Sequence, residues 1–315
     1  MAQAEEENQK RVTVVIVTNQ LALTAADAMA EVRRSGDAGL LHCVPVDNGS
    51  RNGTPDLLCE QSGWADVVLG TANVEFDRGC NIGLDRVTTL YTLFLNLDAS
   101  LGRPAIHSLL VFMDANPRVG VCGPAAVVGG PAQKPRYEVA GRRIGPVDVV
   151  TGLLCSSLAP NDSHRPIQYG VAPYTTGWIC GLVMMVRTDL LKRLGGFDLQ
   201  FFLYWEETDV CKRIEDGGYE AWTVPSELAR HVGDASSGKD ETRIAGCIAK
   251  HYCQSRWHFM IKHHGWLATA LAEGFEACIL GLFTVADVLR GRGLGRLRLC
   301  LKPPLFSTPL KVVAA

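Results

Sequence analysis

The sequence lacks several features that would define its class. It has 11 cysteines but no Cys-x-x-Cys pair, so it shows neither the paired spacing of a zinc site nor the density of a disulfide scaffold. Neither sign of charge is in excess, because 31 lysines and arginines are balanced by 33 aspartates and glutamates. A chain with this balance is not expected to bind nucleic acid. We therefore expect reduced, mostly packed thiols and a cytoplasmic protein.

Long uninterrupted apolar runs are missing as well. The first residues, MAQAEEENQK, are polar and acidic, so we expect no signal peptide and a flexible tail over residues 1–10. Residues 266–289 are strongly apolar, but Glu273, Glu276 and Asp287 interrupt them. The uncharged stretch between these acids is shorter than the about 20 residues that a transmembrane helix needs.

The chain does contain a regular alternation of apolar runs and helical segments. Residues 11–18 (RVTVVIVT) predict a strand buried on both faces, and further strands are expected over 40–46, 66–69, 91–95, 119–122 and 177–187. Helices are expected over 21–35, 55–61, 81–89, 103–114, 188–194, 206–216, 241–264 and 266–289. This order predicts an α/β fold with a mostly parallel central sheet flanked by helices.

Polar residues follow three of the predicted strands. They are Thr18-Asn19, Asp47-Asn48-Gly49-Ser50 and Asn96-Leu97-Asp98. Ligands bind beyond the carboxyl ends of parallel strands, so the connectivity alone brings these groups to one edge. Asp47 can accept a hydrogen bond from a base or a ribose, and Asp98 can ligate a hard divalent cation. Each motif by itself is ordinary turn chemistry, but two at consecutive strand ends favour a binding site.

A further acidic group, Glu206-Glu207-Thr208-Asp209, begins a predicted helix after the aromatic segment 201–205. The helix macrodipole alone accounts for acids in a first turn. The aromatic neighbours add a second effect, because they remove water from carboxylates, which raises the pKa and suits a general base. His231 lies in a segment rich in Gly, Asp and Ser that predicts a loop, where a lone histidine is more often exposed than a ligand.

Several segments resemble glycosyltransferase family 2, in particular its rhamnosyltransferase-like branch. They are VTVVIVTNQ (12–20), VPVDNGSRNGT (44–54), FDRGCNIGL (76–84), YTLFLNLDAS (91–100) and the block 176–225, followed by His231. The most specific part is GGFD followed by FF-x-Y and E-x-x-D-x-C within residues 195–211. The resemblance implies a GT-A type fold and an inverting transfer of a sugar from a nucleoside-diphosphate donor.

The resemblance also implies a donor site. Asp47 resembles the residue that reads the donor base, and Asn81, with Arg78 close by, resembles the stretch that lines the nucleotide pocket. Asp98 and His231 match the positions that hold a divalent cation, Mg²⁺ or Mn²⁺, with Asn96 at the first polar position of the metal motif. The expected donor-binding residues are Thr18, Asn19, Asp47, Asn48, Arg78, Asn81, Asn96 and Asp98.

For catalysis, Glu207 falls where the family has its base, and Glu206 precedes it. The usual residue at this position of the family is aspartate, and the Glu207 side chain is longer by one methylene group. Trp178, Trp205 and Asp209 are expected to contact the acceptor. An inactive relative that acts as a binding or assembly subunit is the alternative. A sugar nucleotidyltransferase would need a glycine-rich basic loop after the first strand, and Val17-Thr-Asn-Gln-Leu has no glycine.

These inferences define a domain plan. We expect a GT-A catalytic domain over 11–235, with a nucleotide-sugar half (11–124) and an acceptor half (125–235) that contains the long loop 125–173. A C-terminal helical segment (236–315) ends in basic, leucine-rich sequence, which fits attachment to an anionic membrane surface. A helix packed on the catalytic domain and a homodimer contact are the alternatives. The expected partners are a donor such as dTDP-rhamnose or a UDP-sugar, and a glycan, lipid-linked or small-molecule acceptor.

Overall fold

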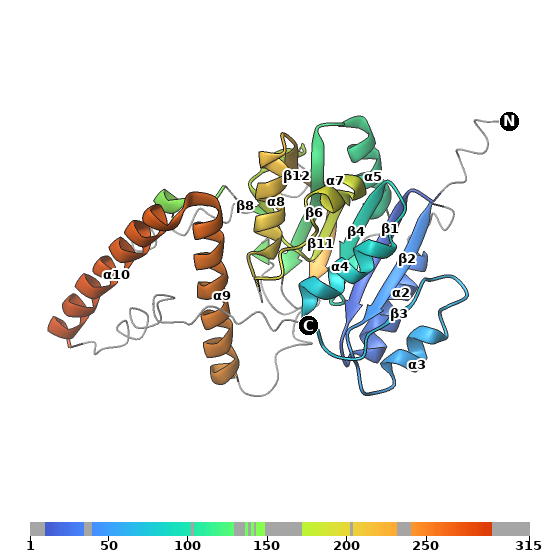
Figure 1. Cartoon of the computed structure of the whole chain (residues 1–315), viewed down its shortest axis with the longest axis horizontal. Coiled ribbons are helices and arrows are strands. Elements are labelled where there is room, and N and C mark those ends of the chain that lie inside the picture. Colours follow the sequence, from blue (N-terminus) through green and yellow to red (C-terminus); the bar gives the residue numbers. More distant parts are fainter. Residues whose placement is uncertain are drawn as a thin grey trace. The chain divides into compact units, whose positions relative to one another are not determined.

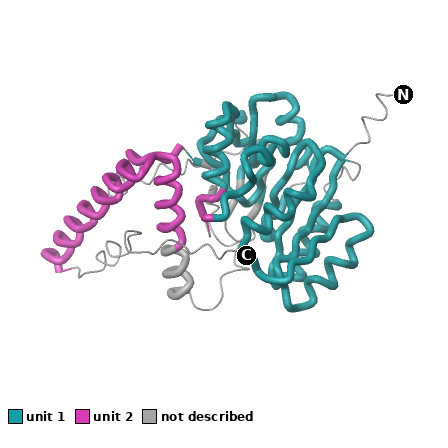
Figure 2. Tube along the Cα trace, in the orientation of Figure 1, with its two compact units in different colours: residues 1–142, 165–199, 207–236 teal, residues 143–164, 200–206, 237–315 magenta. Residues whose placement is uncertain are grey.

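The computed structural model describes residues 10–34, 40–101, 104–128, 136–137, 140–141, 143–148, 172–201, 204–231 and 241–291. The chain divides into two compact units (Figure 2). Unit 1 comprises residues 1–142, 165–199 and 207–236, and unit 2 comprises residues 143–164, 200–206 and 237–315. Most of the expected N-terminal tail and of the loop 125–173 lies outside the described residues.

Unit 1 is built on one large sheet (Figure 1). Its strand order is β3-β2-β1-β4-β11-β6-β12-β5, with β7 beside β6 and β9 beside β12. The strands are β1 (Val12–Thr18), β2 (Leu41–Asp47), β3 (Val68–Leu69), β4 (Tyr91–Leu95), β5 (Ala99–Leu101), β6 (Val119–Val128), β7 (Arg136–Tyr137), β9 (Tyr174–Thr176), β11 (Val183–Arg187) and β12 (Glu220–His231). Among these described strands, β1, β2, β3, β4, β6 and β12 run in one direction, so the sheet is mostly parallel as predicted. A separate two-stranded sheet pairs β8 (Ala140–Gly141) with β10 (Trp178–Ile179).

Helices cover both faces of the large sheet. The helices α2 (Ala22–Arg34), α3 (Thr54–Cys59) and α5 (Ala105–Ala115) pack on the face that carries Val12, Val14 and Ile16. The helices α4 (Phe76–Arg86), α7 (Thr188–Arg193) and α8 (Glu206–Asp216) pack on the face that carries Val15 and Val17. Every residue of β1 is therefore buried, which confirms the prediction of a strand covered on both sides.

Two predicted elements differ from the structure, and one long strand was not predicted. Helix α4 begins at Phe76 instead of at residue 81, because Gly79, although a weak helix former, allows α4 to pack closely on β1. The strand expected over 177–187 is broken at residues 180–182. Strand β12 was not predicted, since Pro225 interrupts its pattern. The structure accommodates this segment through a register shift between Val224 and Leu228, so His231 ends a strand instead of lying in a loop.

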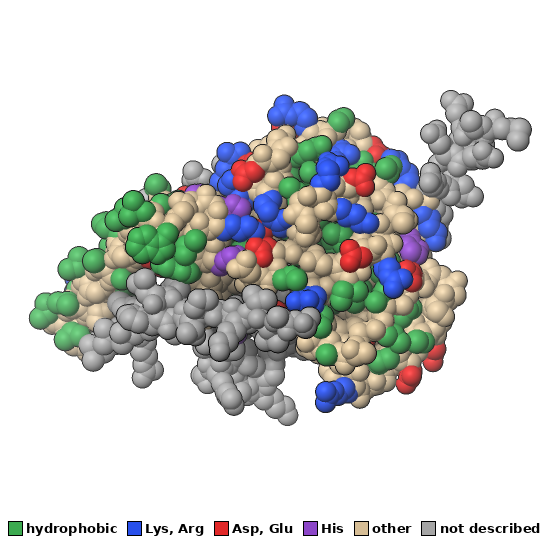
Figure 3. Space-filling view, viewed as in Figure 1, with side chains coloured by type: hydrophobic (Ala, Val, Ile, Leu, Met, Phe, Trp, Pro, Cys, Tyr) green, Lys and Arg blue, Asp and Glu red, His purple; other side chains and the backbone are tan. Residues whose placement is uncertain are grey.

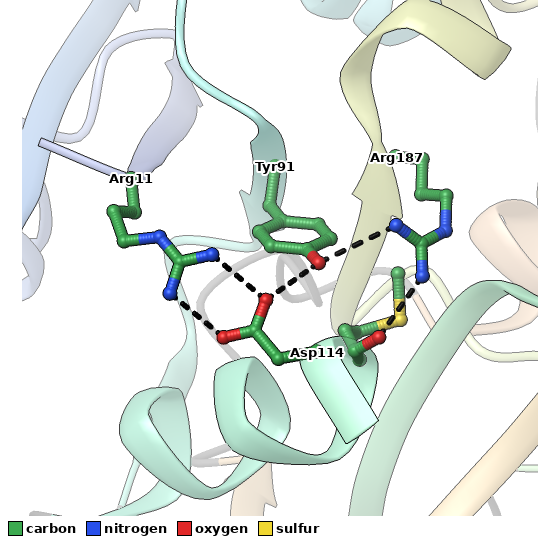
Figure 4. Close-up of polar contacts among 5 residues, drawn as sticks. Arg11, Tyr91, Asp114 and Arg187 are labelled. Carbon is green, nitrogen blue, oxygen red and sulfur yellow. Dashed lines mark hydrogen bonds and ion pairs between the residues drawn. The ribbon is translucent and has the colours of Figure 1, made fainter. Parts of the chain in front are cut away.

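A polar network ties the sheet together at the amino ends of β1 and β4 (Figure 4). Both terminal nitrogens of Arg11 donate to the carboxylate of Asp114 at 2.8 Å, and the Tyr91 hydroxyl donates to the same carboxylate at 2.8 Å. Arg187, the last residue of β11, donates to the Met113 carbonyl at 2.9 Å. Burial and the bond to Asp114 raise the pKa of Tyr91, so its hydroxyl stays a donor. The network lies at the edge opposite the carboxyl ends of β1 and β2.

Unit 2 contains two long helices, α9 (Glu241–His264) and α10 (Trp266–Leu289), joined at Gly265. Its apolar core consists of Phe201, Trp205, Phe259, Met260 and Ala272. Arg256 of α9 donates to Glu273 at 2.8 Å and to Glu276 at 2.5 Å, so two of the three acids that interrupt α10 are paired inside the unit. Among the described helices, α10 alone is long and apolar enough to cross a membrane. The buried core helix of a soluble protein can have the same length and hydropathy.

The close approach of α4 to the sheet gives a stability prediction. A Cβ at Gly83 would lie 2.4 Å from Val15 Cγ1 and 3.2 Å from Val46 Cγ2, and both valines are fixed in the sheet. We expect Gly83→Ala to lower the free energy of unfolding by about 1–3 kcal/mol, measured by denaturant titration. The control is Gly274→Ala in α10, where an added Cβ meets no described atom within 4 Å. This change should leave stability unchanged or raise it by about 0.5–1 kcal/mol. Equal effects of the two changes would contradict the packing argument.

Candidate active site

The carboxyl ends of β1 and β2 form the first part of the site. Thr18 and Asp47 are direct register partners at these two ends. The Asn48 amide donates to the Thr18 carbonyl at 2.7 Å, and Asn19 Nδ2 donates to the Asn48 carbonyl at 2.7 Å. The four residues predicted from these two strand ends thus lie together.

Two buried oxygens at this edge have no hydrogen-bond partner among the described residues. Asp47 is 1% exposed, and its Oδ2 accepts a hydrogen bond from the Ser50 amide at 3.1 Å. Its Oδ1 and the Oγ1 of Thr18 are buried and form no such bond. A buried polar atom without a partner costs about 1–3 kcal/mol, so groups of this kind point to a place where a ligand supplies the partner.

Asn48 has a different function from its neighbours, because its side chain bonds within the protein. Its Nδ2 donates to Asn73 Oδ1 at 3.1 Å and to the Glu75 carbonyl at 3.0 Å, while its Oδ1 accepts from the Val74 amide at 2.8 Å. Asn48 therefore holds the segment that leads into α4.

Helix α4 carries two further residues of the expected donor site, Arg78 and Asn81. Arg78 is exposed. Asn81 Nδ2 donates to the Phe197 carbonyl at 2.8 Å, and its Oδ1 accepts from the Phe197 amide at 2.8 Å. A Cβ at Gly196 would lie 2.3 Å from this Oδ1, so the close contact also requires glycine there. Asn81 thus fixes α4 to the turn at residues 195–197.

The Asn96-Leu97-Asp98 segment forms a tight turn between β4 and β5. The Asn96 side-chain oxygen accepts from the Leu97 amide at 2.9 Å, and the Asn96 carbonyl accepts from the Ala99 amide at 3.0 Å. Ala99 pairs with His231 across β5 and β12. The backbone of His231 therefore lies beside the residue that follows Asp98; the side chain of His231 lies outside the described part.

No group of three metal-binding side chains occurs among the described His, Cys, Asp and Glu residues.

The short segment between β10 and β11 contacts both Glu207 and the turn at Asn96. The Gly181 amide donates to Glu207 Oε1 at 3.3 Å, and the next carbonyl, that of Leu182, accepts from the Asn96 amide at 3.0 Å. Trp178, in β10 just before this break, is half-buried. The predicted base and the predicted metal-binding turn are thus fixed to the same short segment.

Asp209 is not presented to an acceptor in the way predicted. Its side chain is fully buried, and its Oδ2 accepts from Arg213 Nε at 2.7 Å. The two terminal nitrogens of Arg213 donate to the carbonyls of Leu194 and Gly196, at 2.9 and 2.8 Å. Asp209 therefore holds Arg213 against the turn at residues 194–196, which positions α8.

The other residues expected to serve acid–base chemistry or the acceptor belong to unit 2. Glu206 is half-buried. Trp205 is 5% exposed and packs on Phe259 and Tyr252, with ring centroids 5.1 and 5.6 Å apart. Trp205 therefore contributes its ring to the core of unit 2. Its backbone φ of 74° is rare for a residue with a side chain.

Asp77 is a buried acid that was not predicted from the sequence. It lies in the first turn of α4 and is 4% exposed. Burial raises its pKa well above the ordinary value, and the negative charges of Glu207, Glu75, Asp198 and Asp209 raise it further. An acid in the first turn of a helix is expected for any helix, so the sequence held no separate signal for it.

Two buried cysteines of unit 1 are unreactive. Cys43 and Cys211 are buried and form no disulfide bond. Burial raises the pKa of Cys43 and of Cys211 to about 12, which keeps both thiols protonated and unreactive.

Comparison with known proteins gives matches in sequence and in structure. The family model of glycosyl transferase family 2 matches residues 13–149. The N-acetylglucosaminyl-diphospho-decaprenol L-rhamnosyltransferase of Mycobacterium tuberculosis (strain ATCC 25618 / H37Rv) is 25% identical over 244 residues, which cover 70% of this chain and 75% of that protein. The rhamnosyltransferase WbbL of Escherichia coli (strain K12) is 31% identical over 74 residues, 24% of this chain and 28% of that protein.

Solved structures match over most of the chain. The mannosyltransferase PcManGT from Pyrobaculum calidifontis, in complex with GDP-Man and Mn²⁺, gives a TM-score of 0.58 at 18% identity, covering 93% of this chain and 79% of that chain. S. aureus TarS 1-349 gives a TM-score of 0.53 at 13% identity, covering 92% of this chain and 90% of that chain. At these identities the likeness concerns the fold.

Proposed function

Since this chain carries a family 2 glycosyltransferase domain on a GT-A fold, we propose that it is an inverting enzyme that moves a sugar from a nucleoside-diphosphate donor to an acceptor hydroxyl. One observation carries the proposal. The edge with the unpartnered Thr18 and Asp47 oxygens belongs to the same sheet as β11, and Gly181, just before β11, holds Glu207. A binding edge and a base are what this transfer requires.

The donor would bind at the ends of β1 and β2. Asp47 Oδ1 would accept a hydrogen bond from the base or ribose, and Thr18 Oγ1 would contact the same ligand, so that binding satisfies both buried atoms. Asn48 and Asn81 would act indirectly, because their side chains hold the surrounding backbone. The similarity to two rhamnosyltransferases favours a rhamnosyl donor, such as dTDP-rhamnose, over a UDP-sugar.

Glu207 would act as the general base. Its carboxylate takes the proton of the acceptor hydroxyl while that oxygen attacks the anomeric carbon. The bond from the anomeric carbon to the phosphate oxygen breaks, and the nucleoside diphosphate leaves with the electron pair. The Gly181 amide, 3.3 Å from Oε1, orients the carboxylate for this step.

Asp98 and His231 would hold a divalent cation. The strand pairing places the backbone of His231 beside Ala99, the residue after Asp98. A carboxylate together with an imidazole is a ligand pair that suits Mn²⁺ or Mg²⁺. When bound, the ion neutralises charge on the diphosphate leaving group. The mannosyltransferase PcManGT is in complex with Mn²⁺, which supports this assignment.

The first prediction tests the base. Glu207→Gln keeps the size of the side chain but removes its basicity, so we expect sugar transfer to fall by at least about 100-fold while the donor Kd changes little. Radiolabelled sugar transfer and calorimetric donor binding measure the two quantities. The matched control is Glu60→Gln at an exposed position. Transfer by Glu207→Gln at the wild-type rate would overturn the base assignment. Donor binding without transfer by the wild-type chain would favour a binding or assembly subunit.

The second prediction tests the cation. Asp98→Ala removes one of two protein ligands, so Mn²⁺ should no longer strengthen donor binding, whereas the residual binding without metal should match that of the wild type. Thermal shifts with dTDP-rhamnose, UDP-sugars and GDP-mannose, each with Mn²⁺ or a chelator, measure this because a bound donor raises Tm. An Asp98→Ala protein that keeps the full metal-dependent shift would exclude this role.

We also propose that the acceptor is lipid-linked and that unit 2 contacts the membrane surface on its cytoplasmic side. The curated relative acts on a decaprenol-linked substrate. Helix α10 exposes an apolar face (Figure 3). Its members, each between 46% and 82% exposed, are Trp266, Leu267, Leu271, Phe275, Leu282, Val285, Val288 and Leu289. The acids of α10 that pair with Arg256 lie within unit 2, so the helix is suited to lie along a bilayer and not to cross it.

The third prediction tests this contact. The wild-type chain should sediment with vesicles that contain anionic lipid, and Leu282→Glu, at a position 71% exposed, should abolish the binding without unfolding the protein. Leu23→Glu on α2, at a position 79% exposed, is the matched control and should sediment as the wild type does. If Leu282→Glu instead changed only the oligomeric state, the face would be a contact between two copies of the chain.

A further inference from the structure

Glu75, the residue before α4, has a backbone conformation that is typical of glycine. Its φ is 74° and its ψ is 164°. In this region the Cβ of a side chain crowds the backbone, so proteins place glycine there almost without exception. A glutamate at this position therefore makes the fold less stable than a glycine would.

The chain itself uses glycine where the same conformation begins another helix. Gly265, the residue before α10, has a φ of 81° and a ψ of 161°. A Cβ added to Gly265 would meet no described atom within 4 Å, so neighbouring side chains do not select glycine there. The backbone conformation alone explains Gly265, and starting a helix in this way does not require a glutamate.

The side chain of Glu75 makes no polar contact that offsets this cost. It is exposed, does not cap α4, and forms no hydrogen bond or ion pair with a described residue. The bonds that hold this position involve the backbone: the Glu75 amide donates to Asn73 Oδ1 at 3.1 Å, and the Glu75 carbonyl accepts from Asn48 Nδ2 at 3.0 Å. Any residue could form these two bonds, so they do not explain the glutamate.

The location of Glu75 suggests what its carboxylate does. Asn48, which bonds to the Glu75 carbonyl, directly follows Asp47. Asp47 Oδ1 and the Oγ1 of its register partner Thr18 are buried and have no hydrogen-bond partner among the described residues. Glu75 therefore lies at the edge where two buried oxygens point to a ligand, and its backbone is fixed to that edge.

The charge of Glu75 limits the part of a ligand that it can contact. A carboxylate accepts hydrogen bonds from hydroxyl and N–H groups and repels phosphate oxygens. In a nucleoside diphosphate, the pentose and the base carry hydrogen-bond donors, whereas the diphosphate is anionic. The nucleoside is therefore the part of the donor that fits beside Glu75.

We propose that Glu75 is a specificity-determining residue for the donor: its carboxylate accepts a hydrogen bond from a pentose hydroxyl or a base N–H group of the nucleoside. This inference rests on the proposed donor site at the ends of β1 and β2. The glutamate is retained in an unfavourable conformation because it binds the donor. A glycine at this position gives a more stable protein with weaker donor binding.

Two replacements separate donor binding from stability. Glu75→Gly removes the carboxylate and the Cβ, so the nucleotide Kd should rise by about tenfold or more while Tm rises by about 2 °C or more. Glu75→Ala removes the carboxylate but keeps the Cβ, so the Kd should rise as much while Tm stays close to that of the wild type. Scanning calorimetry without nucleotide measures Tm, and titration calorimetry with dTDP, UDP and GDP in the presence of Mn²⁺ measures Kd.

Two controls accompany these variants. Gly265→Ala should lower Tm by about 2 °C or more, because only the backbone conformation opposes the added Cβ. Glu60→Ala, at an exposed position of unit 1, should leave the Kd and Tm close to those of the wild type. If neither Glu75→Gly nor Gly265→Ala changed Tm, the argument from the backbone conformation would fail and the proposal with it.

The binding results distinguish this inference from the proposed function. Binding by Glu75→Ala at wild-type strength would overturn the role of Glu75 and leave the donor site in place. Tighter binding would show that the carboxylate faces the diphosphate, which also contradicts the proposal. A wild-type chain that binds none of the three nucleotides would refute the donor site itself, and the role of Glu75 with it.

Deoxy analogues of the nucleotide that binds most tightly identify the group that Glu75 contacts. If the loss of one pentose hydroxyl weakens binding to the wild type but not to Glu75→Ala, that hydroxyl is the partner. If every deoxy analogue loses as much affinity in Glu75→Ala as in the wild type, and Glu75→Ala still binds the parent nucleotide weakly, the partner is an N–H group of the base.

Discussion

The site depends on the attachment of α4 to two distant parts of the chain. Asn81 bonds to the backbone of Phe197, 116 residues further along, and Gly79 and Gly83 let the same helix lie directly on the valines of the sheet. The helix thereby connects the edge proposed to bind the donor, formed by the ends of β1 and β2, to the turn that Arg213 holds against α8. Without this connection, the distance between the donor edge and Glu207 would not be fixed.

Much of this arrangement could be predicted from the sequence, because it follows from local pattern. The β-branched run of β1 predicted a strand covered on both sides, and parallel strand ends must share one edge, so Thr18 and Asp47 were expected together. Glu207 was predicted at the start of a helix, where the structure has α8.

The parts that could not be predicted depend on long-range contacts. Strand β12 contains Pro225 and a register shift, so its pattern is visible only once β6 lies beside it. The internal use of Asn81 and Asp209 depends on partners that local pattern does not specify. Asp77 resembles any acid at a helix start until its neighbours on α8 are known. Sequence therefore located the edge of the site but not the side chains that hold it rigid.

The network of Arg11, Tyr91, Asp114 and Arg187 has a consequence for how this protein can change (Figure 4). It fastens strands and helix α5 at one edge of the sheet, while the turns at the other edge bear the groups that we propose bind the donor. Replacements in those turns leave the fastened edge intact. New specificities can therefore arise by altering turn residues whose side chains hold no other part of the protein, unlike Asn48, which makes the domain a favourable starting point for natural divergence and for directed evolution.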